Sequence, residues 1–212
     1  MASVKKFTHK AVRNQLRHNE RTLKNPRNTS IDPARSGDNY ALFTPENGSC
    51  YDRYLERKAE LYCYNRSDVK TMAGWIITAP SPEELPAEQQ QHFFQSVYNF
   101  LEDRYHKENV VQAIVHKDEG GLQPHLHFCF IPASPDLKHE DFSERICASA
   151  VLSLDEYMHF HPDLQHYLTA EGFDCCVNSG ITREIGGNLT VDQLKNREEY
   201  LHKKGYKRGV QW

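Results

Sequence analysis

The stretch HKDEGGLQPHLHFCF, residues 116–130, contains three histidines and then runs into apolar sequence. VVQAIVH (110–116) and PHLHFCFI (124–131) each have the short apolar pattern of a β-strand. The segment between them carries Gly120 and Gly121, which suit a tight turn. Together these features predict a β-hairpin.

The predicted hairpin brings the histidines together. Alternate side chains of a strand share a face, so His125 and His127 should point the same way, while the leucine and phenylalanines between and after them face the core. A hairpin that folds back at the glycines places His116 beside His125. Three imidazoles with open coordination positions are typical of a catalytic metal site.

Chance is the alternative explanation, because the chain has 12 histidines in 212 residues. A second pair, His159 and His161, lies in sequence of helical character, where side chains two residues apart diverge by about 200° and cannot share a metal. We assign that pair to the surface or to packing. Neither the cysteines of a zinc deaminase nor an HExxH helix accompanies the hairpin histidines. Histidine ligation is compatible with manganese, zinc, nickel or cobalt, and less naturally with magnesium.

Composition limits the remaining choices. A chain of 212 residues with 38% hydrophobic and 11% aromatic residues can bury a core, and its mean hydropathy of -0.75 is polar but globular. The N-terminal sequence lacks the apolar region of a secretory signal, and no run approaches a membrane span. The six cysteines show no CxxC spacing, so we expect reduced thiols in a cytoplasmic protein without membrane contact.

The charge is unevenly distributed although the net charge is only -3. Residues 1–70 carry 14 Lys and Arg against 8 Asp and Glu, and the first thirty residues carry eight basic side chains and one acidic side chain. A basic segment of this kind attracts phosphate backbones. A solvated charged face is the alternative.

The rest of the chain predicts alternating strands and helices. Loop residues dominate positions 25–39, and a loop of that length in a compact domain is usually functional or disordered. Ser153 can cap a helix that runs toward Gly172, with Pro162 as a kink or break. The other expected elements are a strand in ASVKKF (2–7), a basic helix or turn over 9–23, a strand over 73–79, an amphipathic helix over 82–107 and a strand over 173–177.

Four motifs then appear in order along the chain: HNER (18–21), NYAL (39–42), GWIIT (74–78) and the HKDE and PHLH segments of the hairpin. Their sequence and order resemble the Mob/Pre (MobV-type) plasmid mobilisation relaxases of the HUH endonuclease superfamily. The hairpin turn is longer than usual for that family, and the first strand is short. The long helical C-terminal region that members use for oligomerisation is expected to be absent from this chain.

The strand and helix alternation, together with this resemblance, predicts a single α/β (α+β) domain over residues 1–212. It should have a mostly antiparallel sheet, helices packed on one face and the histidine hairpin near the centre. The resemblance implies a strand-specific DNA nickase that cuts at a plasmid origin of transfer and keeps the 5′-phosphate. It also implies a cation, with manganese expected, on His116, His125 and His127. Partners would be origin DNA, single-stranded near the nick, and a coupling protein.

The resemblance also assigns the nucleophile to a histidine, here His18. A neutral imidazole can attack phosphorus and form a phosphoramidate, provided that a partner orients its other nitrogen. Glu119 is the expected partner, whereas Asp118 would support a metal ligand or the loop. Arg21 could neutralise the phosphate under attack.

Tyr40 is the alternative nucleophile, with Tyr51 and Tyr54 behind it, although each of these tyrosines could equally be a core or a DNA-stacking residue. The expected DNA contacts outside the centre are Lys5, Lys6, Arg13, Arg17, Arg35, Asn39, Arg66 and Lys70. Three other functions remain open at this point. They are a nuclease that uses activated water, an HUH replication initiator that uses tyrosine, and a DNA-binding module without catalysis.

Overall fold

The computed structural model describes residues 2–24, 28–120 and 123–177, and the compact unit to which they belong ends at Val177. A five-stranded sheet has the order β1-β3-β5-β4-β2, and every neighbouring pair is antiparallel. The strands are β1 (Ala2–Thr8), β2 (Tyr40–Phe43), β3 (Lys70–Thr78), β4 (Val110–His116) and β5 (His125–Phe130). The β4–β5 hairpin therefore lies at the centre of the sheet, as predicted.

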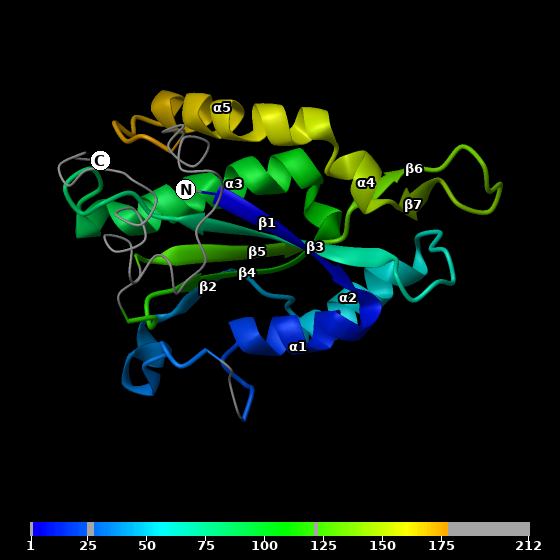
Figure 1. Ribbon diagram of the computed structural model, residues 1–212, viewed down its shortest axis with the longest axis horizontal. Helices are drawn as coiled ribbons and strands as arrows, with labels where there is room; N and C mark the ends of the chain where they lie inside the picture. Colours follow the sequence, from blue (N-terminus) through cyan, green and yellow to red (C-terminus); the bar gives the residue numbers. More distant parts are fainter. Residues whose placement is uncertain (1, 25–27, 121–122, 178–212) are drawn as a thin grey trace, which may run out of the picture. The chain divides into compact units, whose positions relative to one another are not determined.

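Helices cover both faces of this sheet (Figure 1). On one face lie α3 (Gln90–Tyr105) and α5 (Leu154–Ala170), and on the other lie α1 (His9–Asn19) and α2 (Cys50–Ala59). The prediction that helices pack on one face is wrong. Every residue of β4 and β5 is buried, so both faces of the central strands need a cover.

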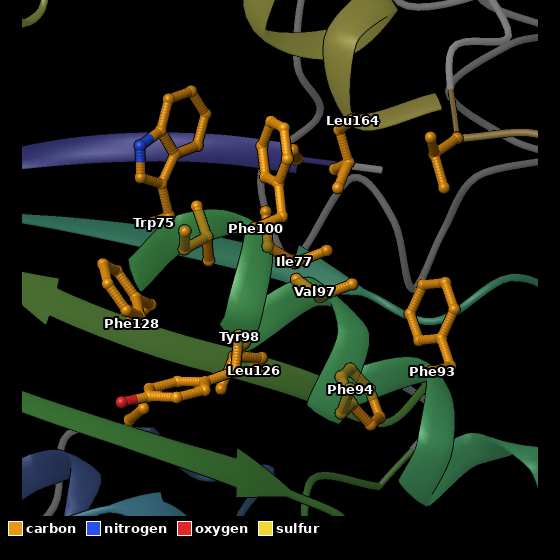
Figure 2. Close-up of a cluster of buried hydrophobic side chains, with 14 of the residues drawn as sticks. Trp75, Ile77, Phe93, Phe94, Val97, Tyr98, Phe100, Leu126, Phe128 and Leu164 are labelled. Carbon is orange, nitrogen blue, oxygen red and sulfur yellow. The ribbon is translucent and has the colours of Figure 1, made fainter. Parts of the chain in front are cut away.

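The larger core fills the space between the sheet and α3 and α5 (Figure 2). Trp75 of β3 stacks on Phe160 of α5 with 3.6 Å between ring centroids, and its indole nitrogen donates a hydrogen bond of 2.8 Å to the Tyr105 hydroxyl. Leu126 and Phe128 of β5 are fully buried in the same core. Burial of each such side chain contributes about 1.5–3 kcal/mol, which fixes β5 and so the hairpin.

The second core lies under α1 and α2. Val12 and Leu16 of α1 pack with Tyr54 of α2 and with Met72 and Cys129 of the sheet. Cys129 follows the histidines of β5 at a spacing of two, so this core lies on the histidine face. This packing holds the C-terminal turn of α1 against the histidine face of β5.

Local sequence explains several helix boundaries. Ser49 and Asp52 form a capping box at the start of α2. Ser153 caps α5 by accepting a hydrogen bond from the Glu156 amide at 3.2 Å, as predicted, but Pro162 stays inside an unbroken helix. The predicted helix over 82–107 is shorter: the 3-10 turn Ala87–Gln89 precedes α3.

Other expectations need correction. Residues 173–177 form no strand, and the loop over 25–39 contains a 3-10 helix, Pro33–Asp38. The short elements β6 (Ala133–Pro135), β7 (Glu144–Ile146) and α4 (Ala148–Val151) complete the unit. Gly121 and residues 178–212 lie outside the described residues, so a single domain over 1–212 stays a prediction. Within the described part of the chain, no helix has the length and apolar character to cross a membrane.

Candidate metal centre

Three histidines meet where the β4–β5 hairpin opens toward its turn. His116 and His125 pair across the strands, and His127 lies on the same face of β5. The ring centroids are 5.5 Å apart for His116 and His125, 4.5 Å for His116 and His127, and 5.0 Å for His125 and His127. The convergence of these side chains, predicted from the hairpin, is confirmed.

Glu119 joins the three histidines. Its Oε1 lies 3.8 Å from Nε2 of His125 and 4.0 Å from Nδ1 of His116. One ligand atom from each of the four residues falls within 4.8 Å of all the others, and all four residues are buried. Sequence reasoning assigned this carboxylate only to the nucleophile, so the structure adds it to the candidate ligands.

Backbone carbonyls set the orientation of two rings. Nε2 of His116 donates to the carbonyl oxygen of Asn19 at 2.8 Å, which turns Nδ1 toward the cluster. Nδ1 of His125 donates to the carbonyl oxygen of Gln123 at 3.1 Å, which leaves Nε2 for the cluster. Sequence reasoning missed Asn19 and Gln123, although Asn19 lies inside the HNER motif and Gln123 inside the stretch 116–130.

The donor atoms fit a divalent cation. Burial, followed by the charge of Arg21, lowers the pKa of His116 to about 4, and burial lowers the pKa of His127 well below its usual value. Burial opposes ionisation of Glu119, but His125 and Arg21 hold its pKa below the usual value. Nε2 of His127 is buried and has no hydrogen-bond partner among the described residues. Neutral imidazoles with one carboxylate are a ligand set for manganese, zinc and related ions.

Arg21 lies beside this cluster rather than on an open surface. Its guanidinium donates to both oxygens of Asp118, at 2.8 and 2.6 Å, and to Glu119 at 2.9 Å. The same Nη2 lies 3.0 Å from Nδ1 of His116, so a single lone pair serves either the guanidinium or a cation. Asp118 and Glu119 therefore balance the charge of Arg21, and a role for Arg21 in neutralising the phosphate under attack stays a prediction.

Asp118 attaches the loop before β2 to the hairpin. Its carboxylate accepts a hydrogen bond of 2.8 Å from Ser36, and its backbone carbonyl accepts one of 2.8 Å from the Asp32 amide. A β-bridge between Ile31 and Glu119 extends the contact. Asp118 therefore supports the loop, one of the two roles expected for it, and the loop forms a wall of the centre.

His18 lies in the last turn of α1, directly before Asn19. It is half-buried, and burial lowers its pKa, with a further contribution from the positive charge of Arg21. Glu119 acts in the opposite direction on that pKa, so the carboxylate is within electrostatic range of the imidazole. No hydrogen bond joins His18 to Glu119 among the described residues, and the orienting role of Glu119 stays a prediction.

The tyrosines lie elsewhere. Tyr40 pairs with Val115, and both pack against the core under α3 and α5, on the sheet face opposite the histidines. Tyr54 is a core residue whose hydroxyl donates to Thr71 at 2.6 Å. Tyr51 is only partly buried, with the guanidinium of Arg13 4.7 Å from its ring centroid.

The basic residues do not form one patch. Lys5 is exposed on the histidine face, where its charge lowers the pKa of His18. Lys6 points to the other face, and its amine contacts the Leu152 carbonyl oxygen at 3.4 Å. Arg13 and Arg17 are exposed one turn apart on α1, as expected of a shared phosphate-binding face.

Four further predicted contacts lie apart from these. Arg35 is exposed in the loop. Arg66 and Lys70 are exposed near the start of β3. Lys70, its first residue, lies about 26 Å along the strand from Thr78, the residue that pairs with His125. Asn39 accepts a hydrogen bond of 2.7 Å from the amide of Lys117, the residue that follows β4, and so fixes the start of the hairpin turn.

The second histidine pair plays no part in this centre. On α5, His159 contacts the carboxylate of Asp155 at 3.2 Å, and His161 lies 3.2 Å from the carbonyl oxygen of Ala2. Their assignment to the surface and to packing is confirmed.

Similarity to known proteins agrees with the four motifs. The sequence profile of the Mob/Pre family, whose description is plasmid recombination enzyme, matches residues 1–202. A plasmid recombination enzyme of Lactiplantibacillus plantarum is 28% identical over 191 residues, which are 88% of this chain and 50% of that protein. The chain spans about half the length of the curated relatives it matches.

Solved structures show the same fold. The MobM relaxase domain, in a manganese-bound crystal structure with plasmid oriT DNA, has a TM-score of 0.72 and 26% identity, and the match covers 93% of this chain and 97% of that chain. The conjugative relaxase TrwC, at a TM-score of 0.50 and 14% identity over 100% of this chain and 87% of that chain, shares the fold alone. With the family profile matched over nearly its whole length, the chain belongs to the Mob/Pre family of plasmid recombination enzymes.

Proposed function

We propose that this chain is a relaxase that cuts one DNA strand at a plasmid origin of transfer and stays attached to the 5′-phosphate. The buried cluster of three histidines and Glu119, with His18 beside it, carries this proposal. The likeness to a relaxase domain bound to oriT DNA supports it. Because plasmid DNA is the substrate, the enzyme would act in the cytoplasm, and a coupling protein remains a predicted partner.

We further propose that His116, His125 and His127 hold a divalent cation, with Glu119 as a fourth candidate ligand. Manganese is the proposed ion, because the MobM structure is manganese-bound and this donor set suits it. A divalent cation at this position would polarise the non-bridging oxygens of the scissile phosphate.

His18 is the proposed nucleophile. Its lowered pKa keeps the imidazole neutral, so that one ring nitrogen has the lone pair needed to attack phosphorus. The nitrogen–phosphorus bond forms as the bond from phosphorus to the 3′-oxygen breaks, and the 3′-oxygen leaves with the bonding electron pair and becomes a hydroxyl by taking a proton from water. Glu119, within electrostatic range, would stabilise the positive charge that develops on the ring and accept the proton from its second nitrogen.

We assign DNA binding near the nick to Lys5, Arg13 and Arg17, which are exposed around α1 and the histidine face. Arg35 and Asn39 would act at the loop before β2, and Arg66 and Lys70 would contact DNA farther from the nick. Lys6 points away from this face, so we propose no nick-site role for it.

The test is to trap the covalent product. Supercoiled plasmid carrying the DNA that flanks the gene is incubated with the protein and manganese, and the residue that carries the DNA is then identified by mass spectrometry of the digested covalent complex. An acid-labile adduct on His18, lost in His18→Ala but kept in the matched His159→Ala control, is the expected result. Cutting without an adduct would indicate hydrolysis by water, and an acid-stable adduct on Tyr40 would overturn the assignment.

A further inference from the structure

A buried amide lies behind the histidines on β4. Gln112 is 0% exposed and shares a strand face with His116, four residues further along. The surrounding sequence, VVQAIVH, is otherwise apolar up to the histidine. Burial of an amide in an apolar core is unfavourable unless its oxygen and nitrogen both find partners, so these partners indicate what the residue does.

Three hydrogen bonds of the Gln112 side chain run to the end of α1, and a further one reaches the Cys50 thiol at the start of α2. Its Oε1 accepts a hydrogen bond of 2.9 Å from Nδ2 of Asn19. Its Nε2 donates to Oε1 of Glu20 at 3.0 Å and, more weakly, to the carbonyl oxygen of Leu16 at 3.4 Å. Gln112 therefore ties the central strand to the turn that carries His18.

Asn19 in turn positions two functional side chains, His116 and His18. It is 1% exposed, and its Oδ1 also accepts a hydrogen bond of 2.9 Å from Gln15. Its backbone oxygen accepts the hydrogen bond from Nε2 of His116. Since His18 is the preceding residue, the position of Asn19 sets both the tautomer of His116 and the place of His18.

We propose that Gln112 is a positioning residue that acts through Asn19. It holds the carbonyl of Asn19 where it keeps the proton of His116 on Nε2 and leaves Nδ1 free for a cation. This inference rests on the proposed function for the role of His116 as a metal ligand. It predicts that loss of the Gln112 amide weakens cation binding although Gln112 contacts no ligand atom.

The test compares Gln112→Met with Val111→Ala. Methionine keeps the length and volume of the side chain but removes its hydrogen bonds, and Val111 packs in the same core under α1 without bonding to the helix. Manganese affinity is titrated through the paramagnetic resonance signal of free Mn²⁺. Nitrogen NMR of the histidines, recorded with chelator, reports the tautomer of His116. Neither measurement needs DNA.

For Gln112→Met we expect Mn²⁺ affinity to fall about tenfold, as for other groups that orient metal-bound histidines, and His116 to show a mixture of tautomers. Val111→Ala should keep wild-type Mn²⁺ affinity and the single tautomer of His116, even if its melting temperature falls as much as that of Gln112→Met. Asn19→Ala breaks the same bond from the other end, and it replaces Gln112→Met should that variant fail to fold.

Wild-type affinity with a single tautomer in Gln112→Met, or an equal change in Val111→Ala, would overturn the inference. A wild-type protein that binds no Mn²⁺ would instead refute the proposed metal site, while the tautomer would still test Gln112. Absence of nicking, with both spectroscopic results as expected, would refute only the proposed function.

Discussion

Replacement of Asp118 by asparagine should strongly destabilise the protein. The Asp118 side chain is 0% exposed and accepts hydrogen bonds from two nitrogens of Arg21 and from the Ser36 hydroxyl. Asparagine is nearly the same size, but it has no charge and turns an N–H group toward these donors. Arg21 would then be left buried with Glu119 as its remaining acidic partner.

The size of the expected loss in unfolding free energy follows from the geometry of the ion pair. Removal of one partner from a buried, hydrogen-bonded ion pair costs about 3–5 kcal/mol. Because Glu119 still pairs with Arg21 at 2.9 Å, we expect the lower end, about 3 kcal/mol. For a unit of this size that loss lowers the melting temperature by roughly 6–12 °C. The matched control is Asp68→Asn, since Asp68 is 71% exposed and pairs with Arg66 at 3.1 Å, and it should cost less than about 1 kcal/mol.

The pH dependence gives a second check. Burial opposes ionisation of Asp118, but the hydrogen bonds from Arg21, Asn39 and Ser36, together with the charge of Arg21, outweigh it and hold the pKa well below its usual value. A lowered folded-state pKa contributes stability that is complete above the unfolded value, about 3.9, and is lost as pH falls below it. Urea unfolding followed by circular dichroism should therefore show a difference in unfolding free energy between wild type and Asp118→Asn. This gap should be full at pH 7 and narrow below about pH 4. A gap under about 1 kcal/mol at pH 7, or one that grows in acid, would refute this reasoning.

Three other predictions concern the centre and its DNA. His127→Ala removes one donor atom, so Mn²⁺ binding by calorimetry and nicking should be lost together while the far-ultraviolet spectrum is kept; binding at wild-type strength would contradict the ligand assignment. The lowered pKa of His18 extends its neutral form to lower pH, so single-turnover adduct formation should lose half its rate below pH 6.5, and a midpoint above that value would oppose a histidine nucleophile. Arg13→Gln with Arg17→Gln should reduce the slope of log affinity against log salt by about 1.4–1.8 in fluorescence anisotropy, and an unchanged slope would exclude both residues as phosphate contacts.

Local signals in the sequence were enough to predict the hairpin. Strand alternation placed His125 and His127 on one face, and the turn length paired His116 with His125. The cap at Ser153 is equally local. Features of this kind depend on neighbours along the chain, so a sequence pattern can identify them.

Contacts between distant segments could not be predicted in the same way. Arg21 meets Asp118 and Glu119 across nearly a hundred residues, and nothing in either segment alone reveals that pairing. The edge strand β2 has four residues, which are too few to show the alternation of apolar and polar residues that identifies a strand. Helix α2 did carry a signal, since Ser49 and Asp52 have the spacing of a capping box before an amphipathic run.

Strand parity and burial together distinguish the two candidate nucleophiles. Tyr40 faces the core opposite the histidines, and burial raises its pKa to about 12, so the phenol stays protonated and weakly nucleophilic. The same removal from water lowers the pKa of His18. Burial disfavours the charged form of either group, but the neutral form of imidazole already has the attacking lone pair, whereas the neutral form of tyrosine must first lose a proton. The Tyr40 hydroxyl has no hydrogen-bond partner among the described residues that could take its proton, so a partly buried centre favours a histidine over a tyrosine as the group that attacks DNA.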